Sequence, residues 1–212
     1  MARSSHPSQS YLRARIAQLA ARLMAEGIED FALAKRKAAR QLGAPLRAKD
    51  TQHLPHNSEV EEALRAYQTL FQGPLQISLL RQLRLQAQGV MRELAQFEPL
   101  LTGSVLHGTA TQYSDIHLLL FADSQKDVAH YLLNKQKMYT VSEKNFRFSD
   151  GPRVIPVLVL NNSDAANVEL AIFSKADHRC LPLSPVNGQV LHGVRLKDMQ
   201  SLLEIPPEAV LR

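Results

Sequence analysis

The sequence predicts an α+β protein in which an N-terminal helical region precedes a mixed β-sheet flanked by helices. Up to about residue 98, apolar residues recur at steps of three and four, the period of an amphipathic helix. From Leu100 onward, apolar runs are short or alternating and are bounded by Asp, Asn, Gly and Pro, as strands are. Helices followed by strands are typical of α+β proteins. We therefore expect a basic helical region over residues 1–98 and an α/β core over residues 99–212.

About four helices are expected in the first region. Residues 11–42 predict two helices, because their leucines and isoleucine repeat along one side and a glycine interrupts the pattern. A third helix is expected over residues 59–71, since Ser58 and Glu61 have the spacing of a capping box. A glycine and a proline then precede a long fourth helix over residues 75–97.

Strands and helices alternate less regularly in the second region. Ser124 and Asp127 again have capping-box spacing and predict a helix after the first long strand. A short helix is expected near residues 195–203. The stretches with strand-like patterns are residues 117–122, 138–143, 153–160 and 167–173.

Basic charge is concentrated at the start of the chain. Up to Lys49 there are ten Lys and Arg against three acids, a net charge of +7, so the other residues sum to −2. Such a patch either attracts a polyanion such as RNA or is a solvated helix face. No apolar run is long enough to cross a membrane, so no membrane partner is expected. The polar start and the single Cys180 favour the cytoplasm.

A Gly-Ser pair and an Asp-x-His sequence are the candidate site residues. Because side chains alternate along a strand, Asp115 and His117 are expected on one side of the strand that they begin. Gly103 allows a tight turn, and Ser104 is expected to cap a short helix whose first N–H groups suit an anion. A polar, flexible loop is expected between Ser104 and Asp115. A phosphate beside the turn and metal ligands on the strand form one coherent interpretation.

This spacing resembles the signature of the DNA polymerase beta-like nucleotidyltransferase superfamily, which is Gly-Ser, nine to thirteen residues, then Asp, an apolar residue, Asp or Glu, and another apolar residue. The chain resembles a minimal, divergent bacterial member with Asp-x-His in place of Asp-x-Asp, over about residues 100–173. The family's third carboxylate lies on a later strand, where Glu169 is the candidate. The matching residues are Gly103, Ser104, ten intervening residues, Asp115, Ile116, His117 and Leu118.

The resemblance implies transfer of a nucleoside monophosphate from an NTP to a hydroxyl acceptor. Asp115, His117 and Glu169 are the implied catalytic residues and the implied ligands of Mg²⁺ or Mn²⁺, and Gly103 and Ser104 the implied nucleotide-binding residues. His117 departs from the pattern, because an imidazole suits softer ions than Mg²⁺. The alternative is therefore a catalytically inactive relative that binds nucleotide or RNA. A third reading is a helical interaction protein with the sheet as scaffold.

Other motifs favour no competing chemistry. His178, Cys180 and His192 suggest a zinc cluster, but they lack a second closely spaced pair of Cys or His. Neither a Gly-x-Ser-x-Gly elbow nor a Walker-type phosphate loop occurs in the sequence.

Overall fold

The chain forms two compact units, Met1–Gly73 and Pro74–Arg212. The computed structural model describes residues 9–44, 54–163 and 165–204. The sequence-based division after residue 98 lies later than this boundary. The long fourth helix explains the difference, because its buried residues belong to the core of the sheet rather than to the core of the first three helices.

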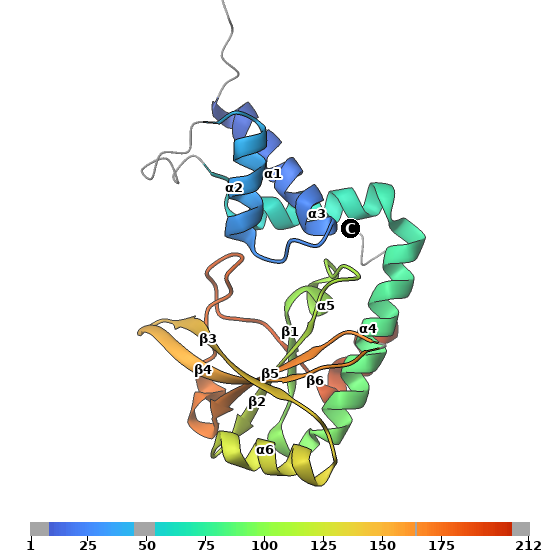
Figure 1. Cartoon of the computed structure of the whole chain (residues 1–212), viewed down its shortest axis with the longest axis vertical. Coiled ribbons are helices and arrows are strands. Elements are labelled where there is room, and N and C mark those ends of the chain that lie inside the picture. The colour runs from blue at the N-terminus through green and yellow to red at the C-terminus, as the bar shows by residue number, and fades with distance from the viewer. Residues whose placement is uncertain (1–8, 45–53, 164, 205–212) are drawn as a thin grey trace, which may run out of the picture. The chain divides into compact units, whose positions relative to one another are not determined.

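Three helices make up the described part of the first unit: α1 (Gln9–Ala25), α2 (Phe31–Gln41) and α3 (Asn57–Phe71) (Figure 1). They confirm the helices predicted over 11–42 and 59–71. Many of the residues at their interface are alanines, which let the helix backbones approach closely. This core includes Ile16, Ala17, Ala20, Ala21, Leu23, Ala34, Ala38, Val60 and Leu64.

The start of α3 differs from its prediction. Its N-cap is His56 rather than Ser58, and the acid of the cap is Glu59 rather than Glu61. The Glu59 carboxylate accepts a hydrogen bond from the His56 backbone N–H at 2.6 Å. Glu59 also pairs with Arg13 of α1, so the same carboxylate takes part in the cap and in a tertiary contact.

The described part of the second unit contains a mixed six-stranded sheet in the order β3-β4-β5-β2-β1-β6. The α+β class predicted from the sequence is thus confirmed. Neighbouring strands β2 and β5 are parallel, and the other neighbours are antiparallel. The strands are β1 (Leu100–Thr102), β2 (Ile116–Ala122), β3 (Thr140–Phe148), β4 (Gly151–Leu160), β5 (Val168–Ser174) and β6 (Val194–Arg195).

Helices connect and cover these strands. The predicted capping box of α6 is confirmed, because the Ser124 hydroxyl accepts from the Asp127 N–H and the Asp127 carboxylate accepts from the Ser124 N–H. The helices described in this unit, with the 3-10 helices marked η, are α4 (Gly73–Glu93), η2 (Ala95–Phe97), α5 (Gly103–His107), α6 (Gln125–Asn134), η3 (Lys175–Arg179), η4 (Leu196–Asp198) and α7 (Met199–Glu204).

The two faces of the sheet bury different residues. On one face, Leu118 and Leu120 of β2 pack with Leu80 and Met91 of α4, which runs alongside the sheet in Figure 1. On the other face, Leu119 and its same-side neighbours pack with aromatic residues of β3 and β5. His117 shares this second face, because side chains alternate along β2. Among the described helices, none is long and apolar enough to span a bilayer.

Candidate functional site

The parallel pairing of β2 with β5 brings the predicted site residues together. His117 lies opposite Glu169 in the register, and its Nδ1 is 2.7 Å from the Glu169 Oε2. Asp115 directly precedes β2 and lies on the same side as His117 by alternation. The side chain of Asn167, just before β5, donates a hydrogen bond to the Asp115 carboxylate. Two acids far apart in the sequence therefore meet at one end of one face of the sheet.

A lysine that the sequence did not indicate completes the group. Lys144 of β3 forms an ion pair with the same Oε2 of Glu169 that His117 contacts. The Glu169 side chain is only 14% exposed. Burial by itself raises the pKa of a carboxyl group, but the hydrogen bonds and positive charge of His117 and Lys144 outweigh burial here and lower the pKa of Glu169 to about 2. Glu169 is therefore ionised at neutral pH and already neutralised by protein groups.

Asp115 has the opposite electrostatic environment. Burial raises its pKa above the ordinary value, and the negative charge of Glu169 raises it further. The hydrogen bond from Asn167 opposes these effects only in part. The influence of Glu169 on Asp115 requires the two carboxylates to be near one another. An additional positive charge would therefore stabilise the ionised form of Asp115 more than that of Glu169.

The Gly-Ser turn adjoins the same group of residues. Thr102 of β1 is paired with His117, and Gly103 follows with φ +75°, a value that L-residues rarely adopt. A Cβ atom on Gly103 would lie 3.0 Å from the His117 Cδ2. The expected role of Ser104 as a cap is wrong: α5 begins at Gly103, its N-cap is Thr102, and no side chain caps it. Helix and strand meet closely here because glycine is present.

Part of the segment between Ser104 and Asp115 is buried and hydrogen-bonded to α4. Thr109, Ala110 and Thr111 are buried. The Gln76 side chain of α4 donates hydrogen bonds to the carbonyl oxygens of Gly108 (3.2 Å) and Ala110 (2.7 Å). The segment is polar, as expected, and a buried amide from another helix satisfies part of its backbone.

Helix α4 fixes the remaining backbone around the site in the same way. The Arg84 guanidinium donates to the carbonyl oxygens of Val105 and Leu106 in α5, and burial lowers its pKa. The Gln86 amide donates to the Ala166 carbonyl oxygen at 2.6 Å, just before β5. Gln76 and Arg84 lie four residues before and four residues after Leu80, on the buried side of α4. This helical spacing was the signal in the sequence that could have identified them as buried polar residues.

The donor groups at this end do not fit the two Mg²⁺ ions that the resemblance implies. Mg²⁺ prefers oxygen ligands, whereas His117 offers an imidazole. The Glu169 Oε2 is already bound to the Lys144 ammonium, which repels a dication at that oxygen. Within the described ranges, no group of three or more His, Cys, Asp or Glu side chains is arranged to hold a metal ion.

The three residues considered for zinc do not all line the same hollow. His178 and His192 line a hollow of ≈ 220 Å³, and Cys180 does not belong to its lining. The His178 Nε2 lies 3.4 Å from the Glu98 carboxylate and 3.3 Å from the Arg195 guanidinium. Polar contacts with Glu98 and Arg195 therefore surround this nitrogen.

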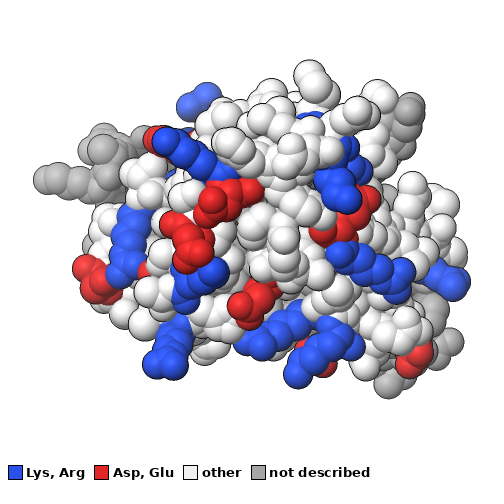
Figure 2. Space-filling model, turned by 90° about the horizontal axis from the view of Figure 1, so that it is seen from below, with Lys and Arg blue, Asp and Glu red and all other residues white. Residues whose placement is uncertain are grey.

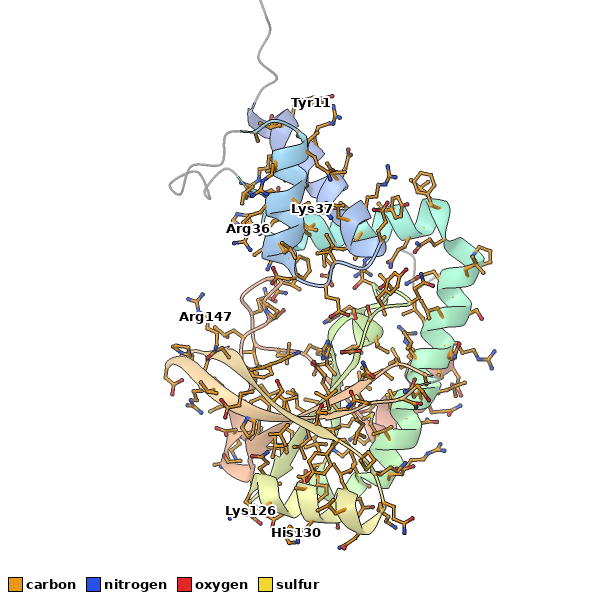
Figure 3. The ribbon with its side chains drawn as sticks, in the orientation of Figure 1. Tyr11, Arg36, Lys37, Lys126, His130 and Arg147 are labelled. Carbon is orange, nitrogen blue, oxygen red and sulfur yellow. The ribbon has the colours of Figure 1, made fainter. Side chains whose placement is uncertain are left out.

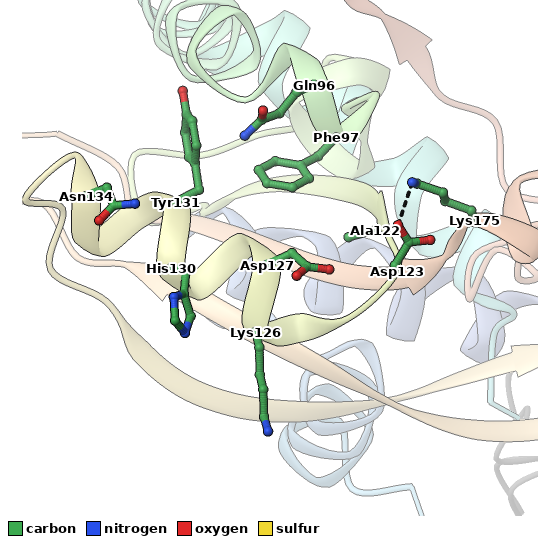
Figure 4. Close-up of a pocket in the computed structure, with 10 residues that line it drawn as sticks. All are labelled: Gln96, Phe97, Ala122, Asp123, Lys126, Asp127, His130, Tyr131, Asn134 and Lys175. Carbon is green, nitrogen blue, oxygen red and sulfur yellow. Dashed lines mark hydrogen bonds and ion pairs between the residues drawn. The ribbon is translucent and has the colours of Figure 1, made fainter.

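A larger hollow of ≈ 490 Å³ lies at the opposite end of β2, beside Ala122 and α6 (Figure 4). Three of its charged groups have local partners: the Lys175 ammonium lies 2.7 Å from Asp123, and Asp127 takes part in the cap of α6. Six residues of strand separate Ala122 from the Asp115 end, roughly 20 Å at the rise of a β-strand. This hollow is therefore separate from the predicted site.

Comparison with protein-family models, with curated proteins and with solved structures finds no match to this chain. The function proposed below therefore rests on the geometry of the site.

Proposed function

We propose that the chain binds a nucleoside triphosphate at the end of the sheet where Gly103 meets His117 and Glu169. One observation carries this proposal: the Gly-Ser turn, the Asp-x-His strand and the later acid, separated by up to 66 positions, lie in one continuous set of contacts. This arrangement matches what the resemblance to nucleotidyltransferases implies. The triphosphate is expected beside Gly103 and Ser104, as the resemblance implies, next to the imidazole of His117 that packs against Gly103.

The charges at the site favour binding without turnover. Glu169 is neutralised by Lys144 and is in contact with His117, so one of the two carboxylates is already occupied. Nucleotidyl transfer of the implied kind depends on metal ions bound by such carboxylates. A catalytically inactive, nucleotide-binding relative therefore agrees best with these contacts.

Nucleotidyl transfer with one Mg²⁺ or Mn²⁺ is the second candidate. Asp115 and Glu169 favour it, because they share one face of the sheet and the charge of Glu169 raises the pKa of Asp115. The acceptor would be a hydroxyl group of RNA, a protein or a small molecule. Asp115, His117 and Glu169 would then be the catalytic residues.

Metal-dependent release of pyrophosphate from labelled NTPs separates the two candidates. We expect binding of NTP by the wild-type protein, with no pyrophosphate above the level of an Asp115→Ala control in either Mg²⁺ or Mn²⁺. Release above that control establishes transfer instead. His117→Asp restores the oxygen ligand of the family pattern and is expected to raise any metal-dependent signal. Absence of NTP binding by the wild-type protein contradicts both candidates.

An anionic partner such as RNA is proposed for the first unit. Arg36, Lys37 and Arg40 are exposed on α2, and the first two are labelled in Figure 3. By contrast, Lys and Arg side chains are interspersed with acidic ones on the face that Figure 2 shows. A cytoplasmic setting, where NTP and RNA are available, agrees with the single Cys180.

A further inference from the structure

Lys144 reaches the site from a distant strand. It lies on β3, which is separated from β5 by β4, and its register partner on β4 is Ile155. Glu169 has Val159 as its partner on the other side of β4. The Lys144 side chain therefore crosses β4 to contact the Glu169 Oε2. The side chain is 45% exposed, so water reaches the lysine although Glu169 is largely buried.

Two nitrogen groups meet one carboxylate oxygen. The His117 Nδ1 approaches the Glu169 Oε2 from β2, and the Lys144 Nζ approaches it from β3. A largely buried carboxylate needs a positive or hydrogen-bonding partner, because its desolvation is otherwise costly. A divalent ion or a lysine can meet this need, but both cannot occupy the same oxygen, since their charges repel.

We propose that Lys144 is a built-in counter-cation that takes the place of a divalent metal ion at Glu169. The inference rests on the proposed function, because it takes this end of the sheet to be the nucleotide site. Lys144 thus determines the specificity of the site. Its charge disfavours the divalent ion that Asp115 and Glu169 would otherwise bind, so that nucleotide binds without a metal ion held by the protein. Asp115 and Glu169 become available together only when the Lys144 charge is removed.

Isothermal titration of Mn²⁺ into the nucleotide-free protein tests this role. We expect Lys144→Met to bind Mn²⁺ at least about tenfold more tightly than the wild type, since a neighbouring positive charge is lost. Lys144→Gln, a second neutral variant, is expected to behave in the same way. Lys144→Arg retains the charge and is expected to bind as weakly as the wild type. Adding Glu169→Gln to Lys144→Met is expected to abolish the gain.

Lys175→Met is the matched control, because Lys175 also pairs with an acid, Asp123, on the same unit but at the other end of β2. It is expected to leave Mn²⁺ affinity unchanged. The proposal is overturned if both neutral Lys144 variants bind Mn²⁺ no better than the wild type. It is also overturned if Lys175→Met produces an equal gain, which would indicate a general effect of net charge.

Failure of this inference can be told from failure of the proposed function. The Mn²⁺ titration contains no nucleotide, and NTP binding is measured separately on the same proteins without metal. A gain in Mn²⁺ affinity with no NTP binding supports the metal-replacing contact and contradicts the proposed function. NTP binding with no gain in Mn²⁺ affinity supports the proposed function and contradicts the metal-replacing contact.

Discussion

Glu169 illustrates what single residues reveal in the sequence and what they do not. Asp115 and His117 could be placed together because strand alternation is a local rule. Glu169 was the candidate that the resemblance implied, on a later strand where apolar residues flank it. Their meeting required the parallel register of β2 and β5. Lys144 could not have been found in this way, because its contact with Glu169 crosses a third strand and follows from the pairing of β3 with β4.

The positive φ of Gly103 predicts that a side chain at this position destabilises the fold. Gly103→Ala should lower the free energy of unfolding by about 1–2 kcal/mol, since an L-residue is strained at positive φ and its Cβ crowds His117. Gly89→Ala, four residues before the end of α4 and with open space around it, should instead raise stability by about 0.5–1 kcal/mol. Urea unfolding of both variants checks this contrast. Equal effects of the two substitutions would contradict the tight turn.

At the level of elements, local patterns predicted those with strong signals. The capping box of α6 was found because its two residues lie within the first turn of the helix, three positions apart. The cap of α3 was misplaced by two residues, and its acid, Glu59, also binds Arg13 of α1, a contact that the local sequence does not indicate. β1 and β6 were missed because three and two residues are too few to show an alternating pattern.

The link between α4 and the segment after α5 gives a prediction at this scale. Gln76→Met should lower the free energy of unfolding by about 1–3 kcal/mol, because two buried carbonyl oxygens lose their donor. Gln82→Met, an exposed change on the same helix, should have little effect. Thermal or urea unfolding provides the comparison. A neutral Gln76→Met would show that the amide does not hold this segment.

The pair between α1 and α3 predicts a dependence of stability on pH. The hydrogen bond from Arg13 lowers the pKa of Glu59 to about 2 from the model-compound value of 4.5. The stabilisation of the folded state by this ion pair is therefore complete above about pH 4.5 and is lost as the pH falls toward 2. Because both side chains are partly exposed, we expect the pair to contribute at most about 1 kcal/mol.

Urea unfolding of the wild type and Arg13→Met over this pH range measures the contribution. The difference between them should be constant near neutral pH and should shrink below about pH 4.5. Arg22→Met removes an exposed pair within α1 and serves as the control. A difference that persists unchanged at pH 2 would assign the stability of Arg13 to packing instead.

For the whole molecule, charge distribution predicts how an RNA partner would bind. If α2 contacts phosphates, a single-stranded RNA should bind with an affinity that falls steeply with salt, and Arg36→Ala, Lys37→Ala and Arg40→Ala together should reduce the log–log slope by about 2. Lys126→Ala, on α6, should leave the slope unchanged. Fluorescence anisotropy across a range of salt concentrations provides both slopes. A flat salt response would remove RNA from the proposal.

The α+β class was predictable from the change in hydrophobic period near Leu100, which reflects local backbone geometry. The boundary between compact units was not, because α4 has the period of any amphipathic helix and its sequence does not say which core it joins. The site was predictable only in part. Its motif is local in the sequence, whereas the buried side chains of Gln76 and Arg84 contact backbone that is distant from them in the sequence.

Backbone amide chemical-shift mapping during titration with each of the four NTPs tests the central claim most directly. We expect the largest changes at Gly103, Ser104 and His117, and we expect them without added metal. Changes confined to the hollow beside α6, or no changes at saturating NTP, would contradict it.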